Sequence, residues 1–319
     1  MVLDPRELYE VDSDVPDLNG AVLLHHLEGF IDAGSAGRLL AEHLTESGEG
    51  RIVARFDIDG LIDYRSRRPT MTYAVDHWAS YDKPALVVRQ HFDEEGTPFL
   101  LLTGPEPDRH WELFTAAVRD LMDRWGVRLA VGFHGIPMGV PHTRPLGVVA
   151  HATRSQLLDD RTGGGHAALG GQFQVPGSVA ALLELRLGEA GLDAMGFAAQ
   201  VPHYLAQSSY PSAALALLES VSRAAGLSLP TGDLRAAAER VNVEIDRQVV
   251  ESTEVSDVVR ALERQYDSFA LAPGKRGLLV EEGEALPTAE EIGSEFERFL
   301  AEQGPTGLPE QGPTGPPEQ

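Results

Sequence analysis

Residues 21–44 read AVLLHHLEGFIDAGSAGRLLAEHL, and this stretch sets the expected fold class. Its first seven residues form an apolar run of strand length. The segment 28–37 is a glycine-containing turn, and the leucines that follow it recur at helical spacing. A strand, a short loop and a helix in this order are the repeating unit of a parallel α/β sheet. We therefore expect an α/β protein.

The same alternation continues along the chain. Strands are expected at 51–58, 84–92, 97–103, 127–135, 147–153 and 192–201. Amphipathic helices are expected between Asp108 and Gly126 and at 178–191 and 212–226, and residues 60–83 read as a hairpin or a long excursion. Strands that alternate with helices favour a mostly parallel sheet with helices on both faces. The expected fold is therefore a three-layer α/β/α fold.

The composition changes along the sequence, and four parts are expected. Residues 1–20 are acidic and polar and are expected to form an irregular N-terminal arm, which the α/β domain at 21–230 follows. Two amphipathic helices are expected to form a helical appendage at 231–272. Residues 273–319 are acidic and rich in proline and glycine, with the tandem octapeptides GPTGLPEQ and GPTGPPEQ, and this composition predicts a disordered tail.

Composition and charge exclude several classes of function. The 319 residues are 42% hydrophobic and 24% charged, which is typical of a globular protein, and they include no cysteine. Disulfides, thiolate nucleophiles and cysteine-based metal sites are therefore excluded. The formal net charge of −23 disfavours nucleic acid and anionic membranes as partners. Because neither a membrane-spanning apolar run nor a signal peptide is evident, a cytoplasmic protein is expected.

The turn at 28–37 carries the first candidate site residues, which are Glu28, Asp32 and Ser35. The two carboxylates would repel a phosphate, so a phosphate-binding loop is not expected there. The sequence AGSAG at 33–37 is a variant of the GxSxG nucleophile elbow, with alanine in place of the first glycine. The alternative is a tight turn in which Ser35 caps the following helix.

The other candidates are basic residues near the ends of strands. His134, His142 and His203 fall at or just beyond the carboxyl ends of predicted strands, and Arg144 lies near His142 in the stretch GIPMGVPHTRP at 135–145. Ligands bind at this edge of an open parallel sheet. The basic residues would therefore converge with the acidic turn around a ligand or a partner.

A second interpretation of the same residues is that they hydrogen-bond the carbonyl groups of their own loops. The histidines of the chain do not show the spacing of metal ligands on a helix, so neither a metal nor a cofactor is expected.

Several motifs together resemble the PAC2 (proteasome assembly chaperone 2) family, and the resemblance is greatest to its actinobacterial branch. An acidic residue, a Gly–Phe pair and two further glycines open the family's first helix, and they correspond to Glu28, Gly29, Phe30, Gly34 and Gly37. GIPMGVPHTRP at 135–145 and LLTGPEPD at 101–108 resemble signatures of the branch, and AAQVPHYLAQSSYPSAALALLE at 198–219 resembles the later pattern of a strand, a Pro–aromatic step and an alanine-rich helix. The resemblance covers residues 20–250.

The resemblance implies a fold similar to nucleoside phosphorylases and hydrolases, and a role like that of non-enzymatic chaperones that help to assemble the proteasome α-ring. The favoured expectation is therefore a protein-interaction or assembly-chaperone-like protein with a proteasome-related partner. It is expected to be a homo-oligomer, with a trimer among the options. The alternative is a small-molecule-binding protein or enzyme on the phosphorylase-like scaffold, so catalysis stays open but is not favoured.

Overall fold

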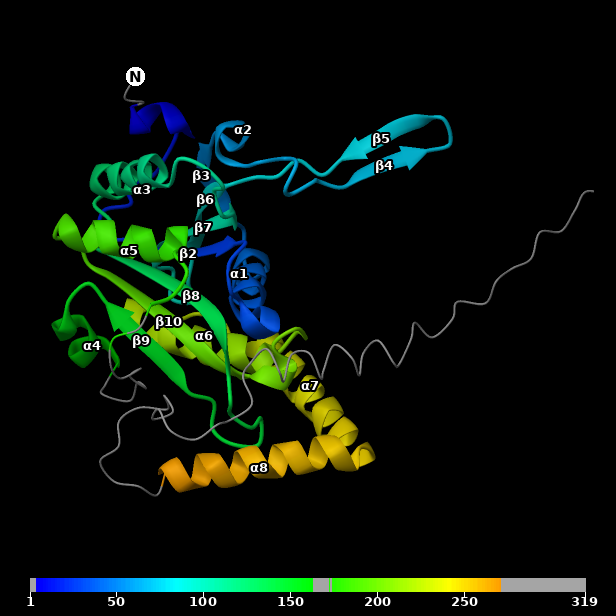
Figure 1. Cartoon of the computed structure of the whole chain (residues 1–319). Coiled ribbons are helices and arrows are strands. Elements are labelled where there is room, and N and C mark those ends of the chain that lie inside the picture. The colour runs from blue at the N-terminus through cyan, green and yellow to red at the C-terminus, as the bar shows by residue number, and fades with distance from the viewer. Residues whose placement is uncertain (1–3, 163–171, 173, 271–319) are drawn as a thin grey trace, which may run out of the picture. The chain divides into compact units, whose positions relative to one another are not determined.

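The computed structural model describes residues 4–162, 172 and 174–270, which build an eight-stranded sheet between two helical layers (Figure 1). The strand order is β1-β3-β6-β7-β2-β8-β10-β9. The four central strands are parallel: β7 (Pro98–Pro105), β2 (Val22–Glu28), β8 (Leu129–Met138) and β10 (Ala194–Pro202). Because β3 runs in the same direction, most strands share one orientation, and the expected α/β/α fold is confirmed.

The outer strands pair antiparallel. β6 (Val87–Phe92) and β7 form the strand pair that the DEEG turn between them predicts, and β6 also pairs with β3 (Arg51–Phe56). At the opposite edge, β9 (Val148–Ala152) pairs with β10. The parallel region is therefore confined to the centre of the sheet.

The expectation of an irregular arm at 1–20 is wrong for residues 5–11. They form a short 3-10 helix, η1 (Pro5–Leu8), and the edge strand β1 (Tyr9–Val11), which pairs antiparallel with β3. The burial of two side chains explains why this segment is ordered. Leu8 and Tyr9 are buried, and the Tyr9 hydroxyl donates a hydrogen bond to Asp120 at 2.5 Å. Burying these two side chains offsets the cost of ordering a polar segment.

Each face of the sheet is covered by its own helices. α1 (Ala36–Glu46), α4 (Ser155–Thr162) and α6 (Pro211–Ala225) pack on one face, whereas α2 (Ile58–Leu61), α3 (Trp111–Trp125) and α5 (Val179–Glu189) pack on the other. β2 is central, so Val22 and Leu24 enter one core and Leu23 enters the other. This double burial explains why the strand reads as a continuous apolar run.

The two helices expected in the appendage are present as α7 (Gly232–Glu251) and α8 (Thr253–Ala270). Leu234 and Ile245 of α7 join the core beneath α6. The predicted disordered tail at 273–319 lies outside the described residues. In the part of the chain that is described, none of the helices combines the length and apolar composition needed to cross a bilayer.

The excursion expected at 60–83 contains a β-hairpin. β4 (Met71–Ala74) and β5 (His77–Tyr81) pair antiparallel as a separate two-stranded sheet, and Figure 1 shows it extending away from the helical layers. Its large apolar side chains are exposed: Met71, Tyr73, Val75, Trp78 and Tyr81. A lone two-stranded ribbon is marginally stable in water, and this one carries an exposed apolar surface.

Candidate functional site

Asp32 organises the turn between β2 and α1. Its carboxylate accepts hydrogen bonds from the backbone N–H groups of Gly37 (2.8 Å) and Arg38 (3.0 Å), which open α1. It also accepts from the Gly135 N–H of β8 (2.9 Å), so one side chain joins two elements. A carboxylate at a helix N-terminus accepts hydrogen bonds from backbone N–H groups that have no partner within the helix, and its negative charge interacts favourably with the positive end of the helix dipole. These contacts give Asp32 a capping role.

Ser35 stands at the position just before α1 but does not cap it. Its backbone lies in the left-handed region (φ 50°, ψ 34°) and its side chain makes no capping hydrogen bond, so the predicted capping role is wrong. The short helix η2 (Ala33–Ser35) brings Asp32 to the helix end instead. In the described chain no histidine is hydrogen-bonded to the Ser35 hydroxyl, which leaves the nucleophile-elbow interpretation without a base.

Two glycines permit this close packing. Gly34 has φ 67°, and a Cβ placed there would lie 2.9 Å from the Cβ of Tyr210. A Cβ at Gly135 would lie 2.1 Å from the carbonyl oxygen of Ala33, which is backbone and cannot yield. The turn at 28–37 is therefore pressed directly against β8 and the segment before α6.

Arg67 joins two further motifs and was not singled out by sequence reasoning. Its guanidinium donates to the carbonyl oxygens of Glu28 (3.1 Å) and Glu106 (2.8 Å) and pairs with Asp108 at 2.9 Å. Gly29 lies beneath it, where an added Cβ would be 2.8 Å from Nη2. The motifs at 28–37 and 101–108 are therefore joined by Arg67, which lies four residues before the first strand of the β4–β5 hairpin. A run of three arginines at 65–68 in so acidic a sequence was the available signal.

Glu28, another predicted site residue, contributes its backbone to this junction. Its carbonyl oxygen accepts from the Glu106 N–H at 2.7 Å as well as from Arg67, while its side chain is exposed. Phe30 and Ile31, which follow it, are also exposed. The carboxyl end of β2 therefore presents apolar surface next to the root of the hairpin.

His142 and Arg144 face the helical appendage. The His142 N–H donates to the Tyr204 hydroxyl (2.9 Å), its Nδ1 lies 2.6 Å from the same oxygen, and its Nε2 lies 3.2 Å from Asp246 of α7. All three contacts are satisfied if the hydroxyl donates to Nδ1 and Nε2–H donates to the carboxylate.

Arg144 forms a forked pair with Asp267 of α8, with Nε and Nη2 at 2.8 and 2.6 Å, and its Nη1 lies 3.2 Å from Glu263. Thr143 donates to the same Glu263 at 2.6 Å. We call these contacts of residues 142–144 with α7 and α8 the loop clasp. The basic side chains of GIPMGVPHTRP are therefore engaged by acids of the same chain.

His203 and His134 lie apart from the loop clasp. His203 begins the short helix η3 (His203–Leu205), its ring lies edge-on to Tyr204, and burial lowers its pKa despite a hydrogen bond to the Met138 backbone. His134 is largely covered in β8, and burial lowers its pKa to about 4. The predicted convergence is thus partial: His142 and His203 share Tyr204, while Arg144 turns to α8.

A group of histidines under α5 was also missed as a unit. His25 of β2, His134 of β8 and His151 of β9 influence one another electrostatically, and His151 Nδ1 lies 2.9 Å from the carboxylate of Glu184 on α5. Glycines make the room: a Cβ at Gly132 would lie 2.6 Å from the His25 ring, and one at Gly196 would lie 2.1 Å from the His151 ring. Across the described ranges, no cluster of acids and histidines has a metal-binding arrangement.

The buried histidines predict acid sensitivity. Burial lowers the pKa of His25 and of His134 to about 4 from 6.5, so the unfolded chain binds their protons first as pH falls. Stability should therefore be full above pH 6.5 and decline by several kcal/mol towards pH 4. His151 acts in the opposite sense, because burial is outweighed by Glu184, which raises its pKa. Urea unfolding measured across this range should show the decline.

The matched control for this prediction is His25→Gln. It should reduce by about one the number of protons taken up on unfolding, and so make the free energy of unfolding depend less steeply on pH. Equal stability of the wild-type protein near neutral pH and near pH 5 would contradict neutral burial of these rings.

With this geometry in view, comparison with known proteins identifies the chain's family. The sequence profile described as the PAC2 family matches residues 26–249, from the end of β2 to α7. The chain belongs to the PAC2 family. The matched range contains the Asp32 turn, Arg67 and the motif at 101–108, so the resemblance that the sequence motifs suggested is confirmed. No curated protein sequence matches the chain.

Solved structures of similar proteins agree with this assignment. The PAC2 chain is 46% identical to a Mycobacterium tuberculosis protein of unknown function, with a TM-score of 0.78 over 93% of this chain and 97% of that one. It is 26% identical to a proteasome-assembly chaperone homologue of the same organism, with a TM-score of 0.66 and coverages of 75% and 99%. A PAC2 family protein of Streptomyces avermitilis is 25% identical, with a TM-score of 0.65 and coverages of 75% and 99%. These relatives agree with the actinobacterial branch.

Proposed function

We propose that this PAC2 protein is a non-enzymatic protein-interaction or assembly-chaperone-like protein that acts on a proteasome-related partner. The observation that carries the proposal is the exposed apolar hairpin β4–β5, joined through Arg67 to two motifs of the family. Tyr73 and Trp78 lie edge to face with their ring centroids 5.1 Å apart, and both are more than half exposed. Aromatic side chains of this kind dominate the binding energy of protein interfaces.

The similarity to a proteasome-assembly chaperone homologue supports this choice of partner. The loop clasp supports the proposal by weakening the alternative of a ligand site. His142 and Arg144 were the residues on which a ligand site would have depended, and both are engaged by acids of α7 and α8. The alternative of a small-molecule-binding protein or enzyme on a phosphorylase-like scaffold therefore has less support.

We further propose that the protein acts as a homo-oligomer in the cytoplasm. A chaperone that works on a ring of subunits gains avidity when it presents several copies of its hairpin. Native mass spectrometry of the intact protein gives the oligomer number directly, including whether it is the trimer considered from the sequence.

The experiment is capture of the host's 20S proteasome α-subunits from cells that contain them, with the full chain as bait. The wild-type protein should enrich the α-subunits, and the double variant Tyr73→Ser, Trp78→Ser should lose most of that enrichment. Each aromatic contact at an interface centre is worth about 2 kcal/mol or more. Both side chains are exposed and lie outside the two cores, so the double variant should keep the α/β fold, while it also removes a cross-strand pair of the hairpin.

Val250→Ser is the matched control, because Val250 of α7 is also an apolar residue exposed to solvent (85%) but lies outside the hairpin. It should capture α-subunits as the wild-type protein does. Absence of α-subunits from the wild-type capture would contradict the proposed partner. Equal loss in the control and the hairpin variant would contradict the proposed surface.

A further inference from the structure

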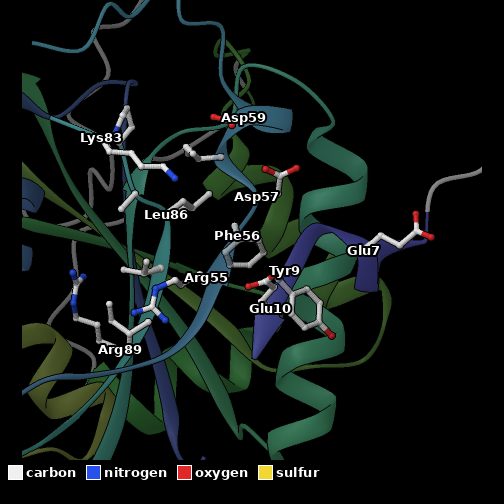
Figure 2. Close-up of a pocket in the computed structure, with 15 residues that line it drawn as sticks. Glu7, Tyr9, Glu10, Arg55, Phe56, Asp57, Asp59, Lys83, Leu86 and Arg89 are labelled. Carbon is white, nitrogen blue, oxygen red and sulfur yellow. The ribbon is translucent and has the colours of Figure 1, made fainter. Parts of the chain in front are cut away.

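A cleft of about 580 Å³ opens at the end of the sheet that β1, β3 and β6 form (Figure 2). It lies apart from the Asp32 turn and from the loop clasp. Apolar groups, among them Phe56 and Leu86, line part of it, and Lys83 enters from the base of the hairpin. Arg55 of β3 and Arg89 of β6 complete a basic side of the cleft.

Within the described part of the chain these three cations form no ion pair, although the charge of Arg55 helps to lower the pKa of Asp12. Among the residues that the structure describes, none of the carboxylates lies within 4.0 Å of Arg55, Lys83 or Arg89. Several other arginines of the described chain do form ion pairs, as Arg186 does with Glu112 at 2.6 Å and Arg247 does with Glu244 at 2.6 Å. What distinguishes Arg55, Lys83 and Arg89 is that all three line one cleft, in a protein with a net charge of −23.

The positive charges of Arg55 and Arg89 also repel each other. Arg89 is half-buried, and its Nη1 donates to the Thr103 hydroxyl at 3.2 Å. Burial and the neighbouring charge of Arg55 both lower the pKa of the Arg89 guanidinium. Holding two like charges together costs free energy unless an anion lies between them.

Acidic residues also line the cleft, and their positions matter. In the view of Figure 2 the basic side chains lie on the left, whereas Asp57 lies near the middle and Glu7 on the right. Asp59 accepts a hydrogen bond from the hydroxyl of Tyr64. Glu10 is the cross-strand partner of Arg55 but does not form an ion pair with it. The basic side therefore keeps donors that these acids leave unused.

We propose that this cleft binds a small oxyanion, a carboxylate or a phosphate, held by Arg55, Lys83 and Arg89. Forked guanidinium groups match the geometry of such oxyanions, and an ammonium adds a third donor. The apolar lining would accept a short hydrocarbon portion of the ligand. This binding site goes beyond the proposed function and does not depend on it.

Acylation of lysine tests the site on the full chain. Lys83 and Lys275 are the two lysines of the sequence, so each reports in a distinct peptide by mass spectrometry. Succinate and inorganic phosphate are the probes, with sodium chloride at equal ionic strength as the reference. Succinate or phosphate should slow acylation of Lys83 several-fold and leave the Lys275 peptide unchanged. The same anion should raise the melting temperature, because it binds only the folded chain.

Variants at the arginines separate binding from general charge effects. Arg55→Gln and Arg89→Gln should each abolish the protection of Lys83, and without an anion they should melt no lower than the wild type, because a repulsion is removed. Arg235→Gln is the control, since Arg235 is exposed and pairs with Glu219 outside the cleft. Protection by succinate alone or by phosphate alone supports the site and identifies the ligand class. Equal protection by chloride, or unchanged protection in both cleft variants, overturns it.

Discussion

Asp32→Ala should lower the free energy of unfolding by about 3 kcal/mol. The change removes the acceptor of three backbone N–H groups, those of Gly37, Arg38 and Gly135. The lost cap frays the start of α1, and the Gly135 N–H in β8 is left without its partner, which costs more than an exposed donor would. Urea unfolding near neutral pH measures the loss.

Glu28→Ala is the control for this change, because it removes a carboxylate four residues earlier whose side chain is exposed. Its effect should stay within about 0.5 kcal/mol. Asp32→Asn keeps an acceptor oxygen and should lie between the two. If Asp32 were a ligand-binding charge with no capping role, its replacement would leave stability unchanged or increase it. Equal stability of Asp32→Ala and the wild type would therefore contradict the capping role.

Arg144→Ala should release α8 from the loop clasp. Arg144 is the centre of the clasp, because it binds Asp267 through two nitrogens and Glu263 through a third. Among the described side chains of α8, Val259 alone is buried, and it belongs to neither core cluster, so the attachment of α8 depends on these polar contacts. Amide hydrogen exchange in α8 should become roughly tenfold faster, while exchange in the central strands stays unchanged.

The charge-swapped double variant Arg144→Asp, Asp267→Arg should restore much of the protection of α8 from hydrogen exchange, because an arginine and an aspartate again face each other at these two positions. Arg247→Ala is the control, since among the described residues Arg247 pairs with Glu244 and Glu251 alone, both in its own helix. High salt should act in the same direction as Arg144→Ala, because exposed ion pairs are screened. Unchanged exchange in α8 of Arg144→Ala would show that apolar packing alone holds the helix.

The hydrophobic patterns along the chain were sufficient to predict most of the strands and helices and the α/β fold class. The alternation of strand and helix, the helical spacing from Trp111 to Trp125 and the doubly buried β2 depend on local periodicity, which a sequence displays directly. The two appendage helices follow for the same reason. The edge strand at 9–11 could not be read in this way, because three residues are too few to show a period and Tyr9 is ordered by its contact with a distant helix.

The roles of the candidate residues depended on neighbours far along the chain. Asp32 and Ser35 both suit a helix cap by residue type, and the left-handed backbone at Ser35 assigned the cap to Asp32. His142 and Arg144 gained their partners from α7 and α8, about a hundred residues later, so no local pattern could reveal them. Local periodicity therefore determined where strands and helices form, whereas the pairing of charges was set by tertiary packing, because electrostatic contacts join side chains by distance in space.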